Sequence, residues 1–85
     1  MSRPSRRVVS AAEAFGRALR RRRRNARLTQ EQLALEADLA RAFVSLLETG
    51  KQQPTFQTMR KLAAALGCKA AEIVAEAETL LDSEA

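Results

Sequence analysis

The sequence predicts an all-α fold of five helices in one domain. Ala, Leu, Glu and Arg, which favour helices, make up most of the 85 residues, and Trp and Tyr are absent. Apolar residues recur at spacings of three and four, and hydroxyl-bearing cap residues and glycines separate the periodic segments.

The first helix is expected over about residues 11–26. Ser10 and Glu13 have the spacing of a capping box, in which each side chain accepts a hydrogen bond from the other residue's backbone amide. The expected apolar side consists of Phe15, Ala18, Leu19 and Ala26, with Arg22 interrupting it. Residues 1–9 contain Pro4 and show no periodicity, so they indicate a flexible basic arm.

A tight turn joins the second and third helices. Thr29 is the expected cap of the second helix, and Gln32 can reach back to the cap amide. The inner face of this helix consists of Leu33, Ala34 and Ala37. Asp38 is expected at the turn, because Asp tolerates the left-handed conformation better than most residues.

The third helix is expected over about residues 40–49, and Gly50 closes it. On a helical wheel, Ala40, Val44 and Leu47 point inward. The opposite face carries one charge and otherwise small or polar side chains, namely Arg41, Ala42, Ser45 and Thr49. Ala40 stands at the cap position but has no side chain that can accept a hydrogen bond. The first backbone amides of this helix therefore lack a side-chain partner.

Two further helices complete the domain. Thr55 caps the fourth and Gly67 ends it, with a core stripe of Phe56, Met59, Leu62, Ala63 and Leu66. The fifth is expected over about residues 69–81, with an apolar side of Ile73, Val74, Ala77, Leu80 and Leu81. The expected organisation is a basic arm over residues 1–9, a helix-turn-helix domain over 10–81 and an acidic tail over 82–85.

Charge is distributed unevenly along the chain. Residues 1–27 carry a net charge of +9 and residues 28–85 a net charge of −4, which together give the +5 of the whole chain. A polycationic part beside an acidic part indicates a polyanionic partner for one face of the molecule.

The sequence lacks the combinations of residues from which metal and catalytic sites are commonly built. There is no His, Cys68 is the single cysteine, and the three glycines form no phosphate-binding loop. We therefore expect no metal, no cofactor and no enzymatic activity. No apolar run reaches the roughly 20 residues of a membrane span, and the basic start lacks the apolar core of a secretory signal. A cytoplasmic protein without membrane contact is expected.

The segments LTQEQLA, LLETGK, PTF and KLAAALG follow one another in the order typical of a known DNA-binding unit. In this order and spacing the chain resembles the Cro/cI-type (Xre) helix-turn-helix family from about Phe15 to Val74. The resemblance implies a lambda-repressor-like fold and a bacterial or phage regulator that binds double-stranded DNA. In length the chain is also similar to the controller proteins of restriction–modification systems.

The resemblance implies a set of contacts to the phosphates. Gln30, beside the cap residue Thr29, would hydrogen-bond a phosphate at the start of the second helix, where the helix dipole favours an anion. A solvated helix start is the alternative for Gln30. Lys51 and the amides of its loop would contact the DNA backbone, and Gln52 and Gln53 would add neutral hydrogen bonds.

The recognition helix, about residues 40–49, would supply the contacts to bases. Arg41 can pair with O6 and N7 of guanine, with a phosphate contact as the alternative. Ala42 could meet a thymine methyl group, and Ser45 a base edge or a phosphate. Phe43 is expected in the core, with a contact to the DNA backbone as the alternative. Leu46 either packs beneath the loop or lies at the edge of the groove.

Arg23 and Glu48 match the positions of an ion pair that fixes the recognition helix in this family. The stem of Arg22 is expected to follow the core while its head reaches solvent. The other arginines are candidates for phosphate contacts (Arg20, Arg24 and Arg27) or for an arm along the minor groove (Arg3, Arg6 and Arg7).

The resemblance finally implies a transcription regulator, most simply a repressor, that binds a two-fold symmetric operator as a homodimer and is associated with the nucleoid when bound. The expected dimer surface consists of Ile73, Val74, Leu80 and Leu81; the alternative is that this helix packs entirely on its own subunit. A protein-interaction module, such as an antitoxin or an adaptor, is a second hypothesis. A toxin would be the partner of an antitoxin, whereas RNA polymerase is a candidate partner of the regulator, which could equally activate transcription by contacting the polymerase. A general nucleic-acid binder that uses the arginine run is a third.

Overall fold

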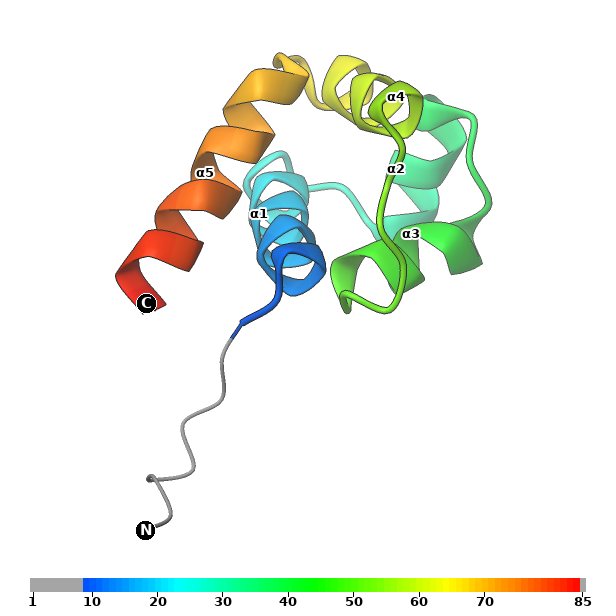
Figure 1. Cartoon of the computed structure of the whole chain (residues 1–85). Coiled ribbons are helices and arrows are strands. Elements are labelled where there is room, and N and C mark those ends of the chain that lie inside the picture. The colour runs from blue at the N-terminus through cyan, green and yellow to red at the C-terminus, as the bar shows by residue number, and fades with distance from the viewer. Residues whose placement is uncertain (1–8, 85) are drawn as a thin grey trace, which may run out of the picture.

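The computed structural model describes residues 9–84, which form five α-helices (Figure 1). The helices are α1 (Ala11–Asn25), α2 (Gln30–Ala37), α3 (Arg41–Glu48), α4 (Phe56–Leu66) and α5 (Ala70–Glu84). Helix α1 lies in the middle, with α5 packed on one side and α3 on the other (Figure 1). The predicted all-α fold of five helices is confirmed.

Local signals in the sequence set the helix ends. The hydroxyl of Ser10 accepts from the Glu13 amide at 3.1 Å, and the Glu13 carboxylate accepts from the Ser10 amide at 3.3 Å. Thr29 and Gln32 form the same reciprocal pair at 3.0 and 2.8 Å. Thr55 caps α4, whereas Ala40 makes no side-chain hydrogen bond at the start of α3. These capping predictions are confirmed.

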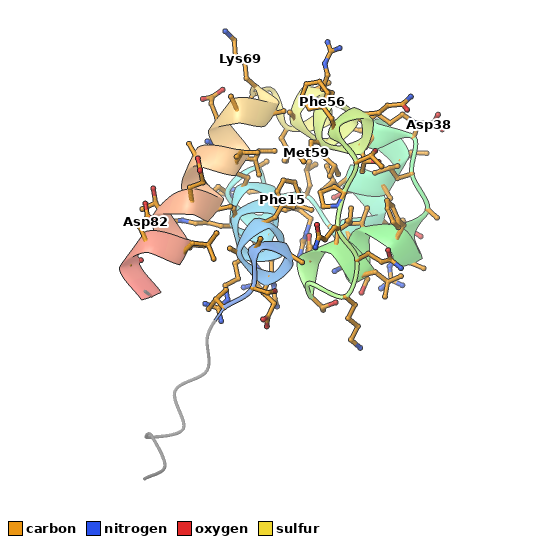
Figure 2. The ribbon with its side chains drawn as sticks, in the orientation of Figure 1. Phe15, Asp38, Phe56, Met59, Lys69 and Asp82 are labelled. Carbon is orange, nitrogen blue, oxygen red and sulfur yellow. The ribbon has the colours of Figure 1, made fainter. Side chains whose placement is uncertain are left out.

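The core contains large apolar side chains from all five helices. Leu19, Leu33, Leu47, Leu62 and Ile73, one from each helix, have no exposed surface. Phe15 and Met59 lie near the middle of the molecule between α1, α4 and α5, whereas Asp38 and Lys69 lie at its periphery (Figure 2). Because every helix contributes to one core, the orientation of α3 depends on the packing of the whole domain.

Several residues lie elsewhere than the sequence predicted. Ala40, assigned to the inward side of the third helix, is exposed because it precedes the first helical residue. Val9, assigned to the arm, is buried in the core and directly precedes the cap of α1, as a hydrophobic staple residue does. Ala26, assigned to the apolar side of α1, is exposed because it follows the last helical residue. Phe56, assigned to the core, is 69% exposed because it is the first residue of α4 and projects from the helix end. The rest of the predicted arm lies outside the described residues.

Helix α5 starts one residue later and ends later than predicted. It runs from Ala70 to Glu84, so residues 82–84 continue the helix instead of forming a separate tail. The sequence Asp-Ser-Glu after Leu81 contains no Gly or Pro that would end a helix, and the Ser83 hydroxyl donates to the Thr79 carbonyl at 2.9 Å. In the described part of the chain, no helix has the length and apolar character needed to cross a membrane.

Candidate nucleic-acid interface

A left-handed residue makes the turn between α2 and α3. Asp38 has φ 56° and ψ 51°, as predicted, and the Leu39 amide donates to the Ala34 carbonyl at 2.9 Å. Val44 and Leu47 then anchor α3 in the core with no exposed surface. The turn and these two anchors hold one side of α3 against the domain and leave the other side in solvent.

The solvent side of α3 differs in part from the helical-wheel prediction. Arg41, Ala42 and Thr49 are exposed, as the wheel indicated. Ser45, predicted to be exposed, and Phe43, predicted to lie in the core, are both half-buried. Phe43 packs against the core, and Leu46 projects into solvent with 36% of its surface exposed. The centre of the exposed face is therefore more apolar than the sequence suggested.

Glu48, the last residue of α3, holds a buried ion pair with α1. The Arg23 Nε donates to one carboxylate oxygen of Glu48 at 2.6 Å, and its Nη2 donates to the other at 3.0 Å. The hydrogen bonds that Arg23 donates to Glu48 raise the pKa of Arg23, so the guanidinium stays charged. Arg23 also donates to the Leu28 carbonyl at 2.8 Å, which ties the start of α2 to the same pair.

Gln30 belongs to this network as well. Its amide nitrogen donates to the Glu48 carboxylate at 3.1 Å, so the side chain at the start of α2 is fixed relative to the end of α3. This bond uses one of the two amide hydrogens and leaves the other, with the amide oxygen, available to a ligand. The contact was not predicted from the sequence, because the two residues are 18 positions apart.

The loop after α3 is held by the helix itself. Gly50 has φ 77°, and the amides of Lys51 and Gln52 both donate to the Leu46 carbonyl, at 3.0 and 3.3 Å. These two amides already donate within the chain, so any phosphate contact from Lys51 or Gln52 would come from their side chains. The side chains of Lys51 and Gln52 are exposed and remain candidates.

The arginine run on α1 divides between two environments. Arg17, Arg20, Arg21 and Arg24 line a shallow surface groove of about 330 Å³ together with Asn25. Arg22, predicted to extend its head into solvent, instead forms an ion pair with Glu76 of α5 at 2.6 Å. Burial is the largest single influence and lowers the pKa of Arg22, but the hydrogen bond that Arg22 donates to Glu76 and the attraction of nearby negative groups together outweigh it and raise that pKa. Arg3, Arg6 and Arg7 lie outside the described residues.

Gly16 is a second contact between α1 and α3 that sequence reasoning missed. A Cβ atom at this position would lie 2.3 Å from the Leu47 carbonyl oxygen and 2.6 Å from that of Glu48. Only glycine allows this approach of the two backbones. A glycine inside a helix destabilises it by about 0.5–1 kcal/mol relative to alanine. A glycine in the middle of the predicted first helix was therefore a sign that another part of the chain approaches closely there.

The residues expected at a dimer surface are not equally accessible. Ile73 has no exposed surface and packs in the core of its own chain, so it cannot contact a second copy as expected. Val74, Leu80 and Leu81 are half-buried. Val74 and Leu81 line a partly apolar groove of about 300 Å³ between α1, α4 and α5.

Candidate metal ligands do not gather in the structure. Among residues 9–84, no group of three His, Cys, Asp or Glu side chains is placed to hold a metal ion. The lone thiol of Cys68 is half-buried at the end of α4. The charged groups at the α1–α3 junction are paired with each other. Nearby, Gln30 is half-buried, while Arg41, Ala42 and Lys51 are exposed.

These features define a helix-turn-helix DNA-binding protein. The chain belongs to the helix-turn-helix family of the Cro/cI (Xre) type, whose defining pattern matches residues 19–73. It is a family of DNA-binding transcription regulators and not of enzymes. The resemblance seen in the sequence is thereby confirmed.

The chain is similar to a phage repressor. It is 36% identical over 69 residues to the immunity repressor protein of Bacillus phage phi105. The matched region covers 81% of this chain and 47% of that relative, so the chain spans about half the length of the phage protein.

Solved structures of bacterial regulators share the fold. The clp gene regulator ClgR from Corynebacterium glutamicum matches with a TM-score of 0.86 at 26% identity, over 92% of this chain and 83% of ClgR. The restriction-modification controller protein C.AhdI from Aeromonas hydrophila matches with a TM-score of 0.72 at 34% identity, over 73% of this chain and 94% of that protein. The lambda-repressor-like arrangement of the five helices is confirmed.

Proposed function

We propose that this protein is a transcription regulator that binds a two-fold symmetric DNA operator as a homodimer, with α3 of each subunit in the major groove. The observation that carries the proposal is the exposed face of α3, which the Arg23–Glu48–Gln30 network fixes beside the start of α2. In helix-turn-helix units the second helix of the unit, here α3, enters the major groove. Dimers of such proteins place their half-sites about 34 Å apart.

The residues on this surface divide into two roles under this proposal. Gln30, Lys51 and Gln52 contact phosphates and set the register of the protein on the duplex, beside the capped helix start at Thr29. Arg41, Ala42 and Ser45 contact base edges, while the half-buried Phe43 borders the DNA backbone. The arginine groove on α1 adds attraction to the phosphate backbone that weakens as salt rises.

Selection from a random duplex library at about 150 mM salt tests sequence recognition. The wild type is expected to enrich a two-fold symmetric motif. Arg41→Ala should lose the preference at one base pair per half-site, because a bidentate pair with guanine contributes about 1–3 kcal/mol of discrimination. Arg60→Ala, which removes an exposed arginine from α4, is the matched control and should leave the motif unchanged. Retention of DNA without any motif would contradict the proposal.

The proposed dimer surface includes Val74, Leu80 and Leu81 of α5. Leu81→Glu is expected to weaken self-association in sedimentation experiments, because it places a charge on the half-buried apolar side of α5 beside Glu78 and Asp82. Leu35→Glu is the matched control, since Leu35 is 82% exposed on α2. Equal dimerisation of the Leu81 variant and the wild type would exclude this surface.

A further inference from the structure

We propose that Phe56 anchors the homodimer by entering the apolar groove between α1, α4 and α5 of the partner subunit, with the two α5 helices antiparallel across the dimer axis. This inference rests on the proposed function, in which the protein is a homodimer. It adds an anchor residue, the site that receives it and the orientation of the two subunits.

Phe56 is a large apolar side chain that α4 leaves in solvent. Its surface is 69% exposed, whereas Phe15 is buried and Phe43 is half-buried. Figure 2 shows Phe56 on α4 near the top of the molecule, while Phe15 and Met59 lie in its middle. Aromatic side chains are enriched among the anchors of protein–protein interfaces, where they bury a large apolar area. Phe56 is therefore a candidate contact to another protein chain.

The apolar groove between α1, α4 and α5 offers a site for such a ring. Its volume is about 300 Å³, and its lining includes Met59, Val74 and Leu81. A cavity of about 150 Å³ is enough to bind benzene, so this groove has room for a phenyl ring. In its own chain Phe56 lies outside the groove. A ring that enters it has to come from another molecule, and a second copy of the chain supplies one.

One side of α5 connects the ring and the groove. Four exposed residues recur there at spacings of three and four, namely Ala71, Ala75, Glu78 and Asp82. Near the start of α5, Phe56 lines a second groove together with Ala71. Toward its end, Glu78 and Leu81 line the apolar groove. A second copy that packs antiparallel on this side therefore brings its Phe56 to the apolar groove of the first.

Charges of opposite sign mark the two ends of the same side. Lys69 directly precedes α5, and Asp82 lies in its last turn (Figure 2). Both charges oppose the helix dipole, which favours anions at the start of a helix and cations at its end. Across residues 9–84, no ion pair involves Lys69, Glu78 or Asp82. The stability of α5 does not explain these charges, whereas an antiparallel partner does, because it places each Lys69 opposite the other subunit's Asp82.

The length of α5 is compatible with this pairing. From Lys69 to Asp82 the chain rises about 20 Å, at 1.5 Å per residue. A two-fold axis that exchanges these two residues crosses α5 midway, beside Ala75. Because Ala75 is exposed and small, two helices can approach each other closely there. The axis also repeats every contact, so each Phe56 contact and each Lys69–Asp82 contact occurs twice in the dimer.

Sedimentation of the full chain tests the aromatic anchor. Phe56→Ala is expected to raise the Kd of the dimer at least about 30-fold, as the loss of an interface hot spot does. At concentrations where both proteins are monomeric, its Tm should equal that of the wild type, because Phe56 is outside the core. Leu35→Ala, which truncates an apolar residue 82% exposed on α2, is the control and should leave the Kd unchanged. A wild-type Kd in Phe56→Ala would overturn the inference.

A charge exchange tests the antiparallel orientation. Lys69→Asp and Asp82→Lys should each raise the Kd about 5-fold at low salt, because each new side chain then faces a like charge. Both substitutions agree with the helix dipole, so neither should destabilise α5. The double variant keeps the net charge of the wild type and restores both pairs, so its Kd should fall below that of either single variant. A double variant that dimerises no better than the single ones would exclude the antiparallel arrangement.

The behaviour of the wild type separates this inference from the proposed function. If the wild type stays monomeric, both alone and on a duplex that carries its selected motif, the homodimer and this inference fail together. If the wild type dimerises and Phe56→Ala dimerises equally well, this inference alone fails. The homodimer of the proposed function would then be held by another surface.

Discussion

Gly16→Ala is expected to destabilise the domain by about 3 kcal/mol or more, although alanine normally stabilises the interior of a helix relative to glycine. The added Cβ would meet the backbone carbonyls of Leu47 and Glu48, and neither can move without shifting α3. Thermal unfolding should show a fall of at least about 12 °C in Tm, since 1 kcal/mol corresponds to about 4–8 °C in a domain of 60–100 residues.

Gly67→Ala is the matched control for this prediction. Gly67 has φ 72°, and a Cβ there would meet no atom within 4 Å, so the substitution adds only the strain of the left-handed conformation. That strain amounts to about 1–2 kcal/mol. A larger loss of stability in the Gly67 variant than in the Gly16 variant would show that the contact between α1 and α3 is not as restrictive as described.

Glu48→Ala should lower the free energy of unfolding by about 3–5 kcal/mol, because it leaves the charged Arg23 without its partner in a buried site. It also removes the acceptor that fixes Gln30. We therefore expect weaker DNA binding even under conditions in which the variant is fully folded. Chemical denaturation followed by a binding titration of the folded variant measures the two effects separately.

The ion pair between Arg22 and Glu76 provides the control. Arg22 and Glu76 meet at 2.6 Å, the same distance as Arg23 and Glu48, but their side chains are 24% and 36% exposed against 11% and 2%. Solvent screens the Arg22–Glu76 pair more than the Arg23–Glu48 pair. Glu76→Ala should therefore lower the free energy of unfolding by no more than about 1 kcal/mol and leave DNA binding intact. Similar losses in the two variants would contradict the argument from burial.

The helices and most of their ends, apart from those of α5, could be predicted because their causes are local. Ser10, Thr29 and Thr55 find their partners three residues away, and Asp38 adopts the left-handed conformation at the position where the apolar periodicity breaks. Gly50 likewise ends α3 as expected. In each case a few neighbouring residues determine the conformation, so the sequence alone is sufficient.

The contacts between helices could not be predicted in the same way. Nothing near Arg22 indicates that Glu76 lies opposite it, and nothing near Gln30 indicates that Glu48 accepts its hydrogen bond. The Arg23–Glu48 pair was expected only because the chain resembles a family that has it. Phe56 was assigned to the core wrongly for a related reason. Its spacing fits a core stripe, but as the first residue of α4 it lies in solvent.

The neighbouring residues Arg22 and Arg23 of α1 contact different helices. Arg22 is held by α5 and Arg23 by α3, so α1 lies between the element proposed for dimerisation and the element proposed to enter the groove (Figure 1). In the proposed homodimer, the distance between the two α3 helices would then be fixed by the rigid packing of each subunit. Regulators whose halves are joined by a flexible linker accept several spacings between half-sites. A protein built in this way should reject an operator in which a single base pair is inserted at the centre.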